Sequence, residues 1–513
     1  SLSWIWDNIV NYTWKKSVHS ITATGVFSAQ KYQYDRLYGA SKDLSFNSLW
    51  YNLNGGAIES LTSNFSQWTM MSYVGRINYG LMDRYLLTAS LRYDGSSRLS
   101  EGNKWALFPS AAIAWRITEE DFAKNLDWLS NLKLRFSYGQ AGNTNSVSPY
   151  ASEGTISGSV YYPFGTSTSV GNLPANIANP MLTWERTSEY NVGLDFGFLN
   201  QRISGNIEYY NRTTNDLLMK RNIPVHLGYS SVTSNVGSVR NSGFELQLNT
   251  ANIMTKNFAW NTTINLAYNK NEIVSLADEE DLSNYSIHLQ GMRGRYSDKR
   301  FIGKPVDTNW TQNTIGVWQL GEEEEAAKYG CVPGNFKIKD YNNDGKLTDD
   351  DYIIDGKRTP DWTGGMTNMF KIYDFDFSFH MYFQAGATQY DRFFENFALE
   401  WNSQNFNNLR TNYWTPENPS NTMGRPSQMG SRGNIAYEKT DFLKVSYITL
   451  GYTLNKRLMS KWGLDNARIY VTVQNPFILT KFRGLDPEQP DLTNIGDTDG
   501  MTMNALLGVN ISF

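Results

Sequence analysis

The chain has 513 residues, a formal net charge of −4, an aromatic content of 14% and one cysteine, Cys331. Its near-neutral mixture of charges gives no basic face for nucleic acid, and a single cysteine excludes an internal disulfide. The mean hydropathy of −0.49 is that of a polar protein, and no stretch approaches the roughly 18 uninterrupted apolar residues of a spanning helix. If the chain lives in a membrane, it must cross as strands.

Apolar and polar residues alternate along most of the chain. From Leu132 to Tyr138 every second side chain is apolar, which places one apolar and one polar face on an extended strand. The pattern returns in about fifteen segments of roughly ten residues, the length that crosses a bilayer when tilted. The predicted strands are 4–12, 20–32, 68–79, 84–94, 105–117, 131–139, 184–197, 202–213, 240–250, 258–269, 362–371, 375–384, 441–454, 467–475 and 505–513.

The connections between these strands are predicted to alternate strictly between short and long. The tight turns are 80–83, 198–201 and 372–374, with 251–257 little longer, and the long links are 33–67, 140–183, 270–361 and 385–440. Outer-membrane barrels have short periplasmic turns and long extracellular loops. The sequence therefore predicts an all-β fold, a transmembrane antiparallel β-barrel, although an aromatic-rich soluble β-protein is the competing interpretation.

The strand count carries a prediction about the ends of the sheet. If every short turn is periplasmic, the first and last strands both run inward and Phe513 lies in the periplasm. An odd count of about fifteen does not suit a closed single-chain barrel, which has an even number and no edge. We therefore expect residues 1–513 to be the C-terminal part of a larger barrel, and direct pairing of strand 4–12 with strand 505–513 would contradict this.

The loop 340–351 has the spacing of a calcium-binding loop. Asp340, Asn342 and Asp344 occupy positions one, three and five, the carbonyl of Lys346 occupies position seven, and Asp351 closes the loop at position twelve. Gly345 at position six permits the sharp turn, and Leu347 supplies an inward apolar residue. The usual Glu at twelve is replaced by Asp, and the competing interpretation is an ordinary Asp/Asn/Gly turn cluster. The predicted role is to rigidify the long link 270–361.

No constellation of catalytic residues is found in the sequence. The four histidines are scattered without metal-ligand spacing, and neither a nucleophile elbow nor a phosphate-binding glycine loop is present. Glu322 to Glu325 precede Ala326 and are predicted to be the acidic first turn of a short helix. We therefore expect no enzyme.

Several segments, taken in order, resemble the SusC/RagA-type TonB-dependent outer-membrane transporters of Bacteroidota. The resemblance covers essentially the whole chain, as the C-terminal half of such a protein. The segments are Arg92–Arg98 with Trp105 and Phe108-Pro109-Ser110; Asn179-Pro180 with Trp184-Glu185 and Tyr190-Asn191; Tyr209-Tyr210-Asn211 with Asp216-Leu217-Leu218; Asn235-Val236-Gly237 with Asn241, Gly243 and Glu245; the calcium-like loop; Gln474-Asn475-Pro476-Phe477; and Gly484 with Asp486-Pro487-Glu488.

The resemblance implies a 22-stranded barrel of the bacterial outer membrane, with a plug domain outside these residues. It implies import of oligosaccharides or peptides, a SusD-like surface lipoprotein as lid, and energy supplied by TonB through the plug. About fifteen strands here would leave seven for the remaining N-terminal portion.

Substrate-binding residues are unknown from the sequence. Loop aromatics are the candidates because their flat faces stack on sugars or peptide side chains, while packing roles compete. The six considered are Tyr161, Tyr162, Trp310, Trp318, Trp401 and Trp414. The alternative function is a secreted or cell-surface, calcium-stabilised glycan-binding β-protein, which would need no detergent.

Overall fold

A computed structural model of the chain describes residues 1–46, 48, 50–224, 226, 228–229, 231–399, 410–426, 431–455, 459, 463–489 and 501–513. Among these residues no helix combines the length and the apolar character needed to cross a membrane.

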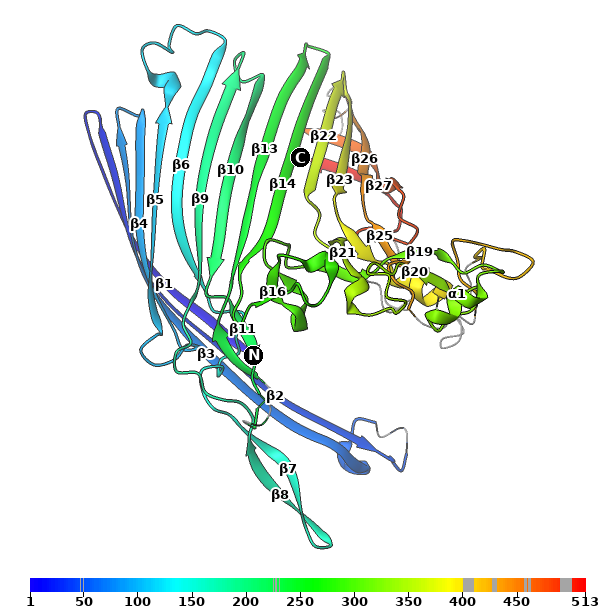
Figure 1. Cartoon of the computed structure of the whole chain (residues 1–513). Helices are drawn as coiled ribbons and strands as arrows, with labels where there is room; N and C mark the ends of the chain where they lie inside the picture. Colours follow the sequence, from blue (N-terminus) through cyan, green and yellow to red (C-terminus); the bar gives the residue numbers. More distant parts are fainter. Residues whose placement is uncertain are drawn as a thin grey trace. The chain divides into compact units, whose positions relative to one another are not determined.

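Fifteen strands form one antiparallel sheet, in the order β1-β2-β3-β4-β5-β6-β9-β10-β13-β14-β22-β23-β26-β27-β28 (Figure 1). Each corresponds to one strand predicted from the two-residue alternation, so the all-β prediction is confirmed. The bounds are β1 Leu2–Lys16, β2 His19–Lys42, β3 Ala57–Leu81, β4 Tyr85–Ser96, β5 Trp105–Arg116, β6 Leu129–Asn143, β9 Glu185–Phe198, β10 Ile203–Asn215, β13 Ser238–Met254, β14 Phe258–Ser275, β22 Trp362–Ile372, β23 Phe375–Ala385, β26 Phe442–Thr453, β27 Asn466–Thr480 and β28 Asn504–Ser512.

The predicted loop 33–67 is wrong over most of its length. β2 and β3 stay paired from His19 and Leu81 as far as Lys42 and Ala57. Polar residues such as Asp35 interrupt the alternation beyond residue 33, but backbone pairing continues where the side-chain pattern fails because the ladder needs no particular side chain. The connection itself is 43–56.

The alternation of connection lengths is less strict than predicted. In a strict alternation, the link 97–104 between β4 and β5 would be long and the link 117–128 between β5 and β6 would be short. The structure shows the reverse, since the first link is the shorter of the two. The chain turns tightly at Ser100–Asn103, since Asn103 N–H donates to the Ser100 carbonyl, and Ser96 N–H donates to the Lys104 carbonyl, both at 3.0 Å. The other short turns lie where predicted.

β1 and β28 are the two ends of the sheet order. The sheet order gives no pairing between them among the described residues. Closure of the barrel by further strands stays a prediction.

By their contacts the residues fall into two units, which we describe separately. Unit 1 comprises 1–119, 135–191 and 212–238, and unit 2 comprises 120–134, 192–211 and 239–513. The smaller elements within the connections are β7 Ile156–Phe164, β8 Ser167–Pro174, β11 Leu218–Asn222, β12 Ser231–Asn235, β15 Glu280–Asp281, β16 Arg293–Arg295, β17 Arg300–Phe301, β18 Thr308–Gln312, β19 Thr314–Val317, α1 Glu323–Lys328, β20 Phe336–Ile338, β21 Tyr352–Lys357, β24 Thr388–Tyr390, α2 Arg392–Phe394 and β25 Tyr437–Lys439. The acidic first turn predicted at 322–325 is confirmed by α1.

β5 in unit 1 shows how the outward face of the sheet is built. Trp105 and Trp115 mark its two ends on one face and are 40% and 36% exposed, whereas Phe108 on the other face is buried. At about 3.4 Å per residue and a tilt of about 40°, this stretch rises about 25 Å, the height of the apolar band of a membrane barrel. Trp105 also stacks on Tyr93 with 4.9 Å between ring centroids. The face has the aromatic ends and apolar centre that a bilayer requires.

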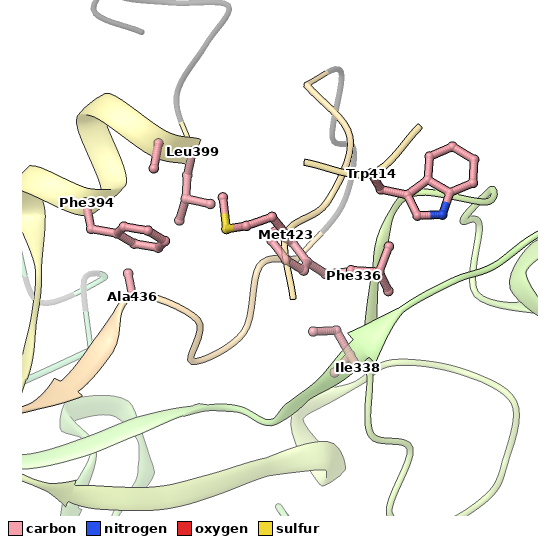
Figure 2. Close-up of a cluster of buried hydrophobic side chains, with 9 residues drawn as sticks. Phe336, Ile338, Phe394, Leu399, Trp414, Met423 and Ala436 are labelled. Atoms are coloured by element: carbon pink, nitrogen blue, oxygen red, sulfur yellow. The ribbon is translucent and has the colours of Figure 1, made fainter. Parts of the chain in front are cut away.

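The long connections of unit 2 pack around their own apolar core. Phe336 and Ile338 from β20 lie against Trp414, Met423 and other side chains of the link 386–441 (Figure 2). Trp414 Nε1–H donates to Gln319 Oε1 at 3.0 Å, so the ring is held by packing and by a hydrogen bond. The described parts of the links 276–361 and 386–441 are therefore folded against each other, and Leu347 of the calcium-like loop packs against the same core.

Candidate functional site

The calcium-like loop lies between β20 and β21. Asp340 Oδ2 accepts a hydrogen bond from Gly345 N–H at 2.9 Å, Asn342 Oδ1 accepts from Asp344 N–H at 3.1 Å, and Asp344 Oδ1 accepts from Lys346 N–H at 2.8 Å. The backbone can follow this path because Gly345 adopts a φ of 77°, in the left-handed region that glycine tolerates. Side chains at positions one, three and five therefore wind the loop as the sequence pattern predicts.

Asp340 is the most constrained of these carboxylates. It is buried, and Tyr329 donates its hydroxyl hydrogen to Oδ2 at 3.0 Å. Burial raises the pKa of Asp340, but hydrogen bonds from Gly345 N–H and the Tyr329 hydroxyl outweigh that effect and hold the pKa below its usual value. Tyr329 responds in the opposite sense, since burial and the neighbouring carboxylate raise its pKa to about 12. The carboxylate therefore stays charged over the whole neutral range.

Asp351 closes the loop from the far end. Its side chain is fully buried; Oδ1 accepts from Tyr341 N–H at 2.8 Å and Oδ2 from Thr348 N–H at 2.9 Å. A second segment buttresses this end, because Ser286 donates its hydroxyl hydrogen to the carbonyl of Asp350 at 3.0 Å. The two ends of the loop are thus joined to each other and to the segment before β16.

The loop offers oxygen donors of the type that a hard cation takes. Asn342 and Asp344 are exposed and each engages one side-chain oxygen with the backbone, while Leu347 packs inward against the core of Figure 2. In the described part of the chain, no group of three or more His, Cys, Asp or Glu side chains is placed to hold a metal ion. The types of oxygen donor and the path of the loop backbone fit calcium. For these oxygens to converge on one ion, the exposed side chains of Asn342 and Asp344 would have to turn inward.

Three of the five aromatic candidates that the structure describes do not offer a stacking face. Trp318 and Trp414 are 3% and 5% exposed, and Trp310 packs against Phe301 with 5.1 Å between centroids. Tyr161 and Tyr162 on β7 are 67% and 40% exposed. Trp401 lies outside the described residues. Loop packing therefore accounts for Trp310, Trp318 and Trp414.

The inward face of the sheet in unit 2 is polar. Side chains from β10, β13, β14, β22 and β23 line a hollow of about 500 Å³, among them Glu208, Glu245, Gln247, Asn265 and His380. Carboxylate, amide and imidazole groups in neighbouring strands form a surface that water or a polar solute wets. The sheet thus has one face suited to lipid and one suited to an aqueous lumen.

Comparison with known proteins agrees with this two-faced sheet. The family described as "TonB dependent receptor-like, beta-barrel" matches residues 3–363. This chain belongs to that family. The chain is 32% identical to TonB-dependent receptor P26 of Formosa agariphila over 534 residues, which cover 99% of the chain and 53% of P26. It is 35% identical to SusC of Bacteroides thetaiotaomicron over 457 residues, 87% of the chain and 44% of SusC.

The fold of the chain matches that of a solved transporter. The structure of the RagAB peptide transporter aligns with a TM-score of 0.81 at 24% identity and covers 100% of this chain and 55% of that one. The resemblance to SusC/RagA-type transporters is confirmed by the family match and the SusC alignment, and the RagAB alignment shows the same fold. The chain spans about half the length of the curated relatives it matches.

The sequence pattern predicted the position of the loop but not the residues outside it that hold it in place. Tyr329 and Ser286 carry no spacing signal, because they reach the loop through the fold of the long connection. The positions of the calcium template, by contrast, are local and could be read directly.

Proposed function

We propose that this chain forms part of the wall and the long loops of an outer-membrane importer for oligosaccharides or peptides. In the assembled protein, further N-terminal strands and a plug complete the barrel, a SusD-like lipoprotein covers it, and TonB supplies energy through the plug. The chain has no catalytic role in this proposal. The observation that carries it is the fifteen-stranded sheet with one apolar, aromatic-edged face and one polar face. The name of the RagAB peptide transporter supports the peptide class, and the oligosaccharide class rests on the resemblance to SusC-type transporters.

Import is tested by growth and uptake. Cells lacking this protein should fail to accumulate a labelled oligosaccharide or peptide that wild-type cells take up, and loss of TonB should have the same effect. Uptake that is independent of TonB would overturn the proposal. The alternative, a secreted glycan-binding β-protein, would stay monodisperse without detergent, whereas the proposed barrel aggregates.

We place the long connections outside the cell and the short turns, with Phe513, in the periplasm. Single cysteines at Thr166, in the turn between β7 and β8, and at Tyr373, in the turn between β22 and β23, test this in a Cys331→Ala background. A membrane-impermeant maleimide should label Thr166→Cys on intact cells and Tyr373→Cys only after the outer membrane is opened. The reverse pattern would invert the topology.

We propose that the loop 340–351 binds calcium through Asp340, Asn342, Asp344, the Lys346 carbonyl and Asp351. The ion would add charge-assisted bonds between the loop ends and so rigidify the link between β14 and β22. Titration calorimetry should detect calcium binding by wild type and by Asp350→Asn, whose side chain is outside the template, but not by Asp340→Asn. Absence of binding by wild type, or unchanged binding by Asp340→Asn, would exclude this site.

A further inference from the structure

A pocket in unit 1 lies between two hairpins of the long connections. β7 and β8 form one hairpin (Figure 1), and β11 and β12 form the other. The pocket encloses about 490 Å³, within the roughly 300–1,000 Å³ range of small-molecule sites. Its lining consists of Ser157, Val160, Leu173–Ile177, Lys220, Gly228, Tyr229 and Ser231–Thr233.

The walls of the pocket are held by hydrogen bonds within and between the two connections. Asn179 Nδ2–H donates to the Thr233 carbonyl at 2.7 Å, which joins the segment after β8 to β12. Asn176 Oδ1 accepts from Thr155 N–H at 2.7 Å, and its Nδ2–H donates to the Glu153 carbonyl at 2.9 Å. The carbonyl oxygen and one N–H of the Asn176 amide are thus used in holding the wall.

The lining of the pocket carries a positive charge and no negative charge. Lys220 is the charged side chain among the described residues that line the pocket, and no carboxylate accompanies it. The side chains of Lys220, Tyr229 and Ser231 make no hydrogen bond or ion pair with the described residues, so their donors are available. Lys220 pairs directly with Thr233 across the hairpin, which puts its side chain on the same face as a second hydroxyl.

The lining also has apolar side chains, those of Val160, Leu173 and Ile177. An ammonium group with neighbouring hydroxyls recognises a carboxylate, and the apolar side chains accept the carbon face of the residue that carries it. A neutral polar solute would leave the ammonium of Lys220 without a partner of opposite charge.

We propose that this pocket is a subsite for a carboxylate-bearing residue of an incoming oligomer, held by Lys220, Tyr229 and Ser231. The carboxylate can belong to a uronic acid ring or to an acidic or C-terminal peptide residue. The subsite rests on the proposed import function for the origin of its ligand, but its binding chemistry is measured without transport.

The test is equilibrium binding to the assembled receptor in detergent. The sugar pair is tri-galacturonic acid and neutral maltotriose; the peptide pair is Ala-Ala-Glu-amide and Ala-Ala-Gln-amide. We expect at least one acidic probe to bind about tenfold more tightly than its neutral partner, the value of one charge-assisted hydrogen bond. Which pair shows the difference identifies the source of the carboxylate.

Variants assign the binding to this pocket. Lys220→Gln should remove the preference for the acidic probe, whereas Lys104→Gln, an exposed lysine of the β4–β5 link outside the pocket, should retain it. Ser157→Trp should block binding by filling the cavity, and Ser157→Ala should preserve it. No preference for either acidic probe in wild type, or a preference that survives both Lys220→Gln and Ser157→Trp, would overturn the subsite. Acid-selective binding without uptake would leave the subsite intact and overturn import instead.

Discussion

The Tyr329 hydroxyl donates a hydrogen bond to Oδ2 of Asp340 at 3.0 Å and so ties the residue after α1 to the first position of the calcium-like loop. Hydrogen bonds to a charged group are worth more than neutral ones, about 1.5–3 kcal/mol. Tyr329→Phe should therefore destabilise the loop locally by about 1.5 kcal/mol. Hydrogen exchange of the amides 340–351 measures this opening. Tyr373→Phe, at an exposed turn, is the matched control and should leave their exchange unchanged.

Acid should open the same loop. The pKa of Asp340 lies below its unfolded value, so its contribution to stability is complete above about pH 4 and is lost as the pH falls through the folded value. Exchange protection of 340–351 should therefore be flat from pH 7 to about pH 5 and decline below about pH 4. Asp340→Asn should show less of this decline. Protection that increases on acidification would contradict the assignment.

Asp391 has the opposite pH dependence. It caps α2 by accepting from Phe394 N–H at 2.9 Å, but its Oδ2 is buried without a hydrogen bond in the described structure. Burial raises the pKa of Asp391 to about 6, with Glu438 also raising it and Arg483 lowering it. Its contribution to stability is full below the unfolded value near pH 4 and is lost as the pH rises through about 6.

Asp391→Asn keeps a good helix cap and removes the charge. The variant should be more stable than wild type by about 2 kcal/mol at pH 7.5 and equal to it at pH 4. Thermal unfolding in detergent at the two pH values measures the difference, with Asp127→Asn at an exposed site as the control. A variant that is less stable at both pH values would show that the carboxyl contributes chiefly as a hydrogen-bond acceptor.

The strands could be predicted because their signal is local and repeated. Trp105 and Trp115, near the two ends of β5, indicate from the sequence alone a strand long enough to cross a membrane. The outer halves of β2 and β3 could not be found in this way, since pairing there continues without side-chain alternation. Neither could the burial of Trp318 and Trp414, because an aromatic in a long link can pack or protrude and only the folded connection decides.

A close approach inside unit 1 gives a prediction with its own control. Trp184 is 1% exposed, meets Phe108 edge to face with 5.3 Å between centroids, and donates its Nε1–H to the Lys104 carbonyl at 2.9 Å. Gly142 lies against both rings, so that a Cβ there would come within 2.2 Å of Phe108 and 2.7 Å of Trp184. Gly142 thus leaves the space that this aromatic pair occupies.

Gly142→Ala must displace rings that neighbouring side chains hold in place. We expect it to destabilise the protein by about 1–3 kcal/mol, the usual cost of overpacking. Gly75→Ala is the matched control, since a Cβ at that strand position meets nothing within 4 Å. The temperature at which the folded band is lost in semi-native electrophoresis should fall for Gly142→Ala and stay level for Gly75→Ala. Equal behaviour of the two variants would mean that the Phe108–Trp184 contact can relax without cost.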